Sequence, residues 1–174
     1  MTDKTLNDLF LHTLKDVYFA EKAILKALPK MEKAAGSAEL KKAFATHREQ
    51  TQGQVERLDR VFEIIGKRAQ AEPCEAIQGL IKEGEEVIET FGGSEVADAG
   101  LISSAQAVEH YEIARYGALK SWADQLGMDD AAGLLAETLT EEEETDALLT
   151  RIAESATTFQ AAQGRGTAKR AARV

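Results

Sequence analysis

The sequence contains a single cysteine, Cys74, and only two prolines among its 174 residues. One cysteine cannot close an internal disulfide, so a disulfide-stapled scaffold is excluded. Long apolar runs are also missing, since no stretch approaches the roughly 18 residues that a membrane-spanning helix needs. The first five residues, MTDKT, lack the apolar segment of a secretory signal. These absences lead us to expect a cytoplasmic protein that does not enter membranes.

Strand-forming runs of valine and isoleucine are absent, and positive charge is scarce. The formal net charge of −9 argues against nucleic-acid binding, because neutralising phosphates needs clustered Lys and Arg. The one basic segment is 163–174, which carries four cations and no acid, and we predict that it is a disordered tail. Residues 1–162, rich in Leu, Ala, Glu and Lys, suit one all-α domain.

Apolar residues recur every three or four positions over several long segments, which indicates amphipathic helices. Thr5 and Ser37 are suitable N-caps, and Gly66 is a suitable stop signal. The connection after the second helix is long enough for the next long helix to lie parallel to it. We therefore predict an all-α, ferritin-like four-helix bundle whose long crossover carries a short extra helix between helices two and three. The four long helices are predicted at about 5–35, 38–65, 94–126 and 130–159, and the short one at 74–91.

Each predicted long helix carries acidic or polar residues on its inner face near mid-length. Burying an isolated ionised carboxylate in a bundle core costs free energy. A cation bound between several carboxylates would offset that cost. Residues at i, i+3 and i+4 share one helix face, so the third and fourth helices can each present two ligands. Carboxylates with one imidazole suit Fe, Mn or Zn, and an oxygen-only subset suits Mg or Ca. The predicted metal ligands are Glu21, His47, Glu109, Glu112, Glu142 and Asp146.

The same residues are open to a second interpretation. Acids at helical spacing often form a solvated face, and the run 141–144 holds four glutamates at every angle round its helix. The inner polar groups can then satisfy one another and water, in a non-catalytic, dimeric helical interaction module. The sequence leaves open whether Gln50, Gln54 and His110 join the site, and whether Tyr116 bonds a ligand carboxylate or simply packs.

Four segments together resemble the YciE/YciF family of bacterial ferritin-like stress proteins. They are DVYFAEKAILKALPKM (16–31), HREQTQGQVERLDRVF (47–62), QAVEHYEIARYGAL (106–119) and TLTEEEETDALL (138–149), and they occur in the family's order. The resemblance implies a ferritin-like bundle, a rubrerythrin-like site for two divalent metal ions, with Fe or Mn favoured, and a homodimer. It also implies a stress-linked role without defining a reaction.

The sequence departs from the wider ferritin pattern in its histidines. That pattern expects Glu-x-x-His on the second and fourth helices, whereas the second helix here reads His47-x-x-Gln50 and the fourth has no histidine. Glu142 and Asp146 stand in that place. The expected site is therefore poorer in imidazole, and a ferroxidase or peroxidase reaction is not carried over from the resemblance.

Overall fold

The computed structural model describes residues 4–155. The predicted tail 163–174 and the predicted helix end at Phe159 lie outside these described residues. Within them the chain is all-helical, with no strand and no helix long and apolar enough to cross a membrane. The helices are α1 (Leu6–Ala34), α2 (Ala38–Ile64), α3 (Glu75–Phe91), α4 (Ala97–Gln125) and α5 (Asp129–Ser155).

The helix ends follow the local capping chemistry. Thr5 accepts a hydrogen bond from the backbone of Asp8, whose side chain accepts one from the backbone of Thr5, which forms a capping box. Ser37 caps α2 in the predicted way, and Gly66 follows it with a positive φ of 65°. α4 begins at Ala97, three residues later than predicted, and its N-cap residue makes no side-chain hydrogen bond.

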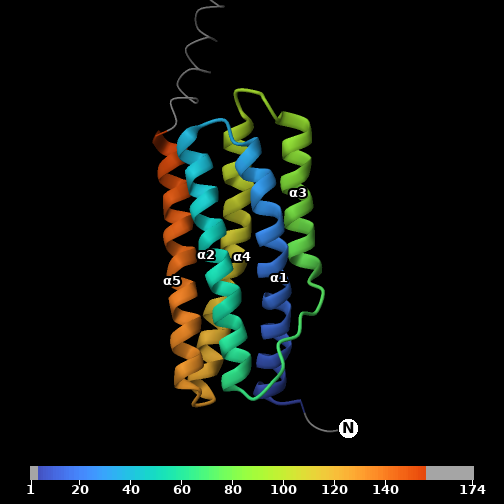
Figure 1. The fold of residues 1–174 in the computed structure, drawn as a ribbon, viewed down its shortest axis with the longest axis vertical. Helices are drawn as coiled ribbons and strands as arrows, with labels where there is room; N and C mark the ends of the chain where they lie inside the picture. The colour runs from blue at the N-terminus through green and yellow to red at the C-terminus, as the bar shows by residue number, and fades with distance from the viewer. Residues whose placement is uncertain (1–3, 156–174) are drawn as a thin grey trace, which may run out of the picture.

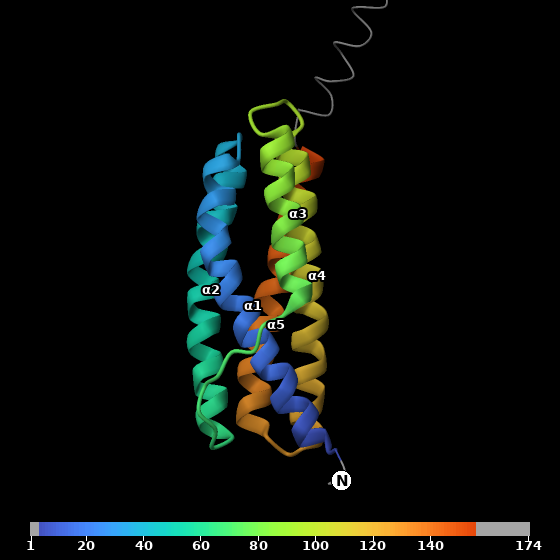
Figure 2. The same cartoon turned by 90° about the vertical axis from the view of Figure 1, so that its right-hand side faces the viewer.

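Four long helices, α1, α2, α4 and α5, stand side by side along the long axis of the molecule (Figure 1). α1 packs against α2 and α4, and α5 packs against the same two helices. α1 and α5 run in one direction, while α2 and α4 run in the other. The crossover therefore makes α2 and α4 parallel, as predicted, and the described residues form a ferritin-like four-helix bundle. Its extra helix, α3, packs against α4 and α1 (Figure 2).

The apolar core is divided into two clusters along the bundle. One cluster includes Phe10, Leu58, Leu119 and Leu135. The other includes Ile24, Phe44, Leu101 and Leu149. Along α2, α4 and α5 the predicted ligands fall between the residues of the two clusters: His47, Glu109, Glu112 and Glu142. On α1, Glu21 lies where the two clusters meet, directly after Ala20. A buried polar layer therefore interrupts the core near its middle.

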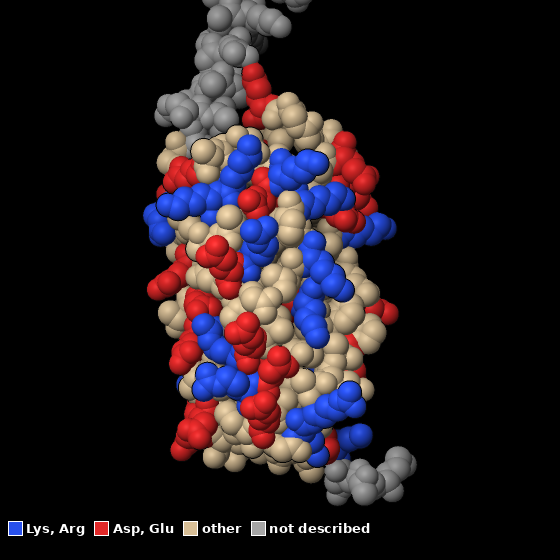
Figure 3. Space-filling view, in the orientation of Figure 1, with Lys and Arg blue, Asp and Glu red and all other residues tan. Residues whose placement is uncertain are grey.

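The surface mixes charges of both signs. On the face shown in Figure 3, Lys and Arg side chains are interspersed with Asp and Glu over the whole length of the bundle. Mixed exposed charge favours solubility and contributes little to stability. The acidic residues relevant to a metal site are the buried ones of the polar layer, inside the bundle.

Candidate metal centre

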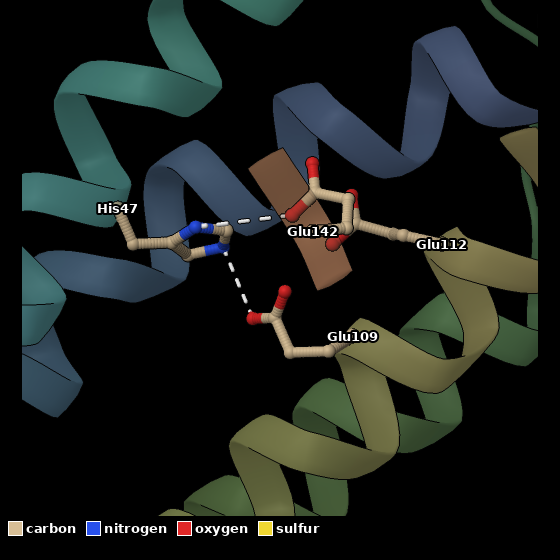
Figure 4. Close-up of side chains that lie close together, drawn as sticks. All are labelled: His47, Glu109, Glu112 and Glu142. Atoms are coloured by element: carbon tan, nitrogen blue, oxygen red, sulfur yellow. Dashed lines mark ion pairs between the residues drawn. The ribbon is translucent and has the colours of Figure 1, made fainter. Parts of the chain in front are cut away.

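Four buried side chains from three helices meet in the polar layer. His47 of α2, Glu109 and Glu112 of α4 and Glu142 of α5 each offer one ligand atom, and these atoms all lie within 4.8 Å of one another. Figure 4 shows the imidazole and the three carboxylates converging on one small region. An ion placed there would lie within reach of one nitrogen and several oxygens.

Helix geometry explains how these residues come together. Glu109 and Glu112 are three residues apart on α4, so both project from one face. α5 packs against both α2 and α4, which carries Glu142 to the same level as His47. All four side chains are at least nine-tenths buried, so bulk water does not solvate their charges.

His47 is a neutral imidazole in this environment. Its Nε2 lies 3.3 Å from Oε1 of Glu109, and its Nδ1 lies 4.0 Å from Oε2 of Glu142. These contacts would be salt bridges only if the ring were protonated, but burial lowers the pKa of His47 to about 4. The neutral ring keeps a nitrogen lone pair, which is what a metal ion needs.

The acids of the group resist ionisation when no cation is present. Burial raises the pKa of Glu109 and of Glu112 well above the usual range, and the charge of Glu142 raises both further. Burial likewise raises the pKa of Glu142 to about 7. Each shift reflects the free energy of holding negative charges together away from water. A divalent cation between the carboxylates would offset that energy.

Glu21 of α1 is fully buried beside this group. Its Oε1 accepts a hydrogen bond from the phenol of Tyr116, while its Oε2 has no partner. Burial and the charge of Glu142 raise the pKa of Glu21 well above its usual range, which places the two carboxyls in electrostatic contact. Tyr116 therefore bonds a predicted ligand, the first of the two roles that its sequence position left open.

Asp146, the sixth predicted ligand, lies outside the four-residue group. Its Oδ1 accepts a hydrogen bond of 3.0 Å from Gln106 and lies 3.3 Å from Nε2 of His110. The side chain of His110 is 70% exposed, so this contact faces solvent. A ligand role for Asp146 stays a prediction. Gln50 is half-buried, whereas Gln54 is fully buried next to the group.

A bound metal ion would provide a partner for buried ligand atoms that have no hydrogen-bond partner in the bundle. Among the described residues, nine buried side-chain nitrogen and oxygen atoms lack a hydrogen-bond partner. Buried polar atoms without partners are rare in native proteins, because each one costs about 1–3 kcal/mol. All nine belong to the polar layer, in Glu21, His47, Gln54, Glu109, Glu112 and Glu142. The residues present therefore have the composition and the free lone pairs of a metal site.

An ion-pair network next to the group, between Arg57 and Glu141, was not predicted from the sequence. Arg57 donates hydrogen bonds to both carboxylate oxygens of Glu141 and a bond of 2.9 Å to Thr138. Gln54 donates to the same carboxylate at 3.0 Å. The available signal was the spacing of Gln54 and Arg57, which are three residues apart and so share one face of α2.

The fold and the buried group together define a class: a ferritin-like helical bundle with an inward-facing cluster of carboxylates and one histidine. Within that class, the chain belongs to the family described as "Domain of unknown function (DUF892)", whose profile matches residues 5–162. It is 49% identical to Protein YciF of Escherichia coli (strain K12) over 154 residues, which are 88% of this chain and 93% of that protein.

Solved structures show the same relationship. The crystal structure of the E. coli stress protein YciF matches with a TM-score of 0.85 and 46% identity, covering 91% of this chain and 99% of that one. YcfI from Rhodopseudomonas palustris, whose description proposes a structural role, matches with a TM-score of 0.82 and 46% identity over 84% of this chain and 94% of its own. A Xanthomonas campestris protein shares the fold at 22% identity, with a TM-score of 0.70 over 91% of this chain and 98% of its own.

Proposed function

We propose that this protein binds two divalent metal ions, iron or manganese, in the polar layer of the bundle and acts in a stress response. The observation that carries the proposal is that all nine unpartnered buried side-chain atoms of residues 4–155 are confined to that layer. A bundle that served packing alone would be more stable with apolar side chains at these positions, because buried acids destabilise a core.

The donor set favours iron or manganese over the alternatives. Three carboxylates and one imidazole combine hard oxygen ligands with a nitrogen ligand, which suits Fe, Mn or Zn better than Mg. Four residues are few for two ions, so the second ion would need further donors. The free oxygen of Glu21 is one such donor, and Asp146 is another if its side chain turns inward.

The chain's own residues would hold and isolate the bound ions. Iron or manganese would supply redox or Lewis-acid chemistry in such a site. Tyr116 fixes the orientation of Glu21 by its hydrogen bond, and the two apolar clusters keep bulk water from both ends of the polar layer. Glu141 raises the pKa of Glu142, and its partner Arg57 places a positive charge near the buried acids that acts in the opposite direction.

The stress-response part of the proposal rests on the relatives. YciF of E. coli is described as a stress protein and matches nearly the whole of its own length. We extend that role to this chain, together with a homodimeric state and a cytoplasmic location.

Metal analysis of the purified protein tests the proposal. Protein prepared without chelators, and again after loading with Fe(II) or Mn(II), is expected to carry up to two ions per chain by elemental analysis. Anomalous scattering measured at the iron and manganese absorption edges should place them between His47, Glu109, Glu112 and Glu142. A content below about 0.2 equivalents of every metal after loading, with a folded protein, would refute the proposal.

A second candidate function is a non-catalytic helical module. It is favoured by the description of YcfI and by the raised pKa values of the acids, since neutral carboxyls can share protons as hydrogen bonds. In that case no added metal would stabilise the fold, and Glu142→Gln would leave stability unchanged or raise it whatever metal is added.

A further inference from the structure

A small apolar pocket reaches from the surface to the polar layer. It has a volume of about 40 Å³ and is lined by residues of all five helices. Most of its walls are aliphatic or aromatic, and they include Ile24, Leu28, Phe44, Leu80, Ile88 and Leu149. The second apolar cluster is therefore not completely filled, and the unfilled part lies against the candidate metal centre.

The two ends of the pocket differ in character. At its surface end Lys30 of α1 and Glu85 of α3 form an ion pair of 3.0 Å, and about half of each side chain is exposed. At its inner end it is lined by His47 and Glu109, which are 4% and 1% exposed. Both ring nitrogens of His47 and one oxygen of Glu109 have no hydrogen-bond partner there.

We propose that this pocket binds a small, uncharged, apolar molecule of two or three heavy atoms, such as a diatomic gas, beside His47 and Glu109. One water molecule needs roughly 10–15 Å³ of such volume, so the pocket has room for about three water-sized groups and no more. An acyl chain or an aromatic ring does not fit without opening the bundle.

The apolar lining of the pocket disfavours charged ligands, just as its small volume excludes large ones. A hydrated ion or a small anion would lose its water shell against aliphatic walls that return no hydrogen bonds. Water itself needs two to four polar partners, whereas the walls between the Lys30–Glu85 pair and the His47 end are mostly aliphatic. An uncharged apolar molecule loses neither charge solvation nor hydrogen bonds on entering. The pocket therefore serves a ligand that differs chemically from the metal ions. Contact between this ligand and a bound metal ion depends on the proposed function. Binding of the ligand in the pocket does not depend on it.

Xenon tests the pocket directly, because it binds apolar cavities and needs no metal. Crystals of the metal-free protein pressurised with xenon are expected to show an anomalous peak between Phe44, Leu80 and Ala105. Ordered water filling the pocket, or the absence of xenon from it, would overturn the proposal. Because the readout does not involve metal, a protein that binds xenon but no iron or manganese would refute only the proposed function.

Two variants assign the xenon signal to this volume. Ala105→Leu places three more carbons in the pocket, so the xenon peak should disappear while the affinity for added metal stays within about twofold. If that variant does not fold, Gly84→Ala provides the same test. A methyl group at Gly84 meets the Cβ of Ser104 at an ordinary 3.6 Å, and both residues line the pocket, so xenon occupancy should fall.

Gly79→Ala is the matched control on the same helix. Gly79 is exposed on α3, a methyl group there meets nothing within 4 Å, and the residue does not line the pocket. Both glycine replacements raise helix propensity alike, so they differ only in the pocket. Xenon occupancy that falls equally in Gly79→Ala and Gly84→Ala, or that survives Ala105→Leu unchanged, would contradict the assignment.

Discussion

The phenol of Tyr116 on α4 donates a hydrogen bond to Oε1 of Glu21 on α1, and both side chains are completely buried. The bond joins two adjacent helices of the bundle and leaves only Oε2 of Glu21 free. A carboxylate held in this way can present one oxygen in a constant direction, which is the arrangement that supports metal ligands in other proteins.

Tyr116→Phe should therefore weaken metal binding without unfolding the protein. The ring still fills its place in the core, but Glu21 becomes free to turn, and the loss of such a partner typically lowers metal affinity by about 10-fold or more. Titration of the metal-free protein with Mn(II) or Fe(II) measures the change. Tyr18→Phe is the control, since it removes the 2.7 Å hydrogen bond to Asp59. Equal losses in both variants would show that Tyr116 has no specific role at the site.

Glu142→Gln should abolish the stabilisation that metal confers. A ligand present at 100 times its dissociation constant stabilises the folded state by about 2.7 kcal/mol, and an amide in place of the carboxylate removes a central donor. The metal-free variant should be as stable as the original or more so, because a buried acid has been neutralised. Thermal unfolding with and without metal measures both effects. Glu143→Gln, an exposed neighbour on α5, should behave like the original protein.

The buried acids should make the metal-free protein less stable as the pH rises from about 4.5 through about 7. Folding raises the pKa of Glu142 from 4.5 to about 7, and the pKa values of Glu109 and Glu112 rise well above 4.5. The folded state thus holds protons that the unfolded state has released, so this contribution is complete below pH 4.5 and is lost as the pH passes the folded values.

The imidazole of His47 has the opposite effect on the stability of the fold, over a slightly lower pH range. Folding lowers its pKa from 6.5 to about 4, so its contribution grows between these values and is constant above them. Urea unfolding of the metal-free protein at several pH values above about 6.5, where the His47 contribution is constant, isolates the carboxyl effect. Added metal should reverse the trend, because it binds the deprotonated acids. A stability that is independent of pH in this range without metal would contradict the assignment of the buried acids.

Asp146→Asn distinguishes the two acids of α5. Glu142 is completely buried in the group, whereas Asp146 bonds Gln106 and lies near the exposed His110. From this geometry we expect the variant to bind at least one metal ion with near-original affinity, while Glu142→Gln loses binding. Elemental analysis and calorimetric titration of both variants provide the comparison. A loss of all metal in Asp146→Asn would show instead that this side chain turns inward when metal binds.

Arg57→Ala should destabilise the fold by about 2 kcal/mol. The guanidinium makes charge-assisted hydrogen bonds to Glu141, and the two side chains are 19% and 24% exposed. Without Arg57 the partly buried carboxylate of Glu141 loses these hydrogen bonds. Urea unfolding measures the loss. Arg48→Ala removes a 3.2 Å pair with Glu32 whose side chains are 42% and 32% exposed, so less than about 1 kcal/mol is expected there. Similar losses in the two variants would contradict a special role for Arg57.

Much of the buried polar layer could be predicted because it lies on long helices. Five predicted ligands stand at inward polar positions on apolar stripes, and all five are buried in one layer: Glu21, His47, Glu109, Glu112 and Glu142. The Arg57–Glu141 network was missed, because Glu141 stands in a run of four glutamates that point in every direction. Periodicity within one helix cannot indicate which of them a neighbouring helix approaches.

The sequence by itself determined the helices, the N-caps of α1 and α2 and the parallel course of α2 and α4, because these depend on periodicity, turn residues and the length of one connection. Only the tertiary structure decided which acids meet. Glu142 and Asp146 are one turn apart on the same stripe, yet the packing of α5 against α2 and α4 buries the first and leaves the second 24% exposed. Packing also leaves the apolar pocket beside His47, since an unfilled volume depends on how the side chains of five helices fit together.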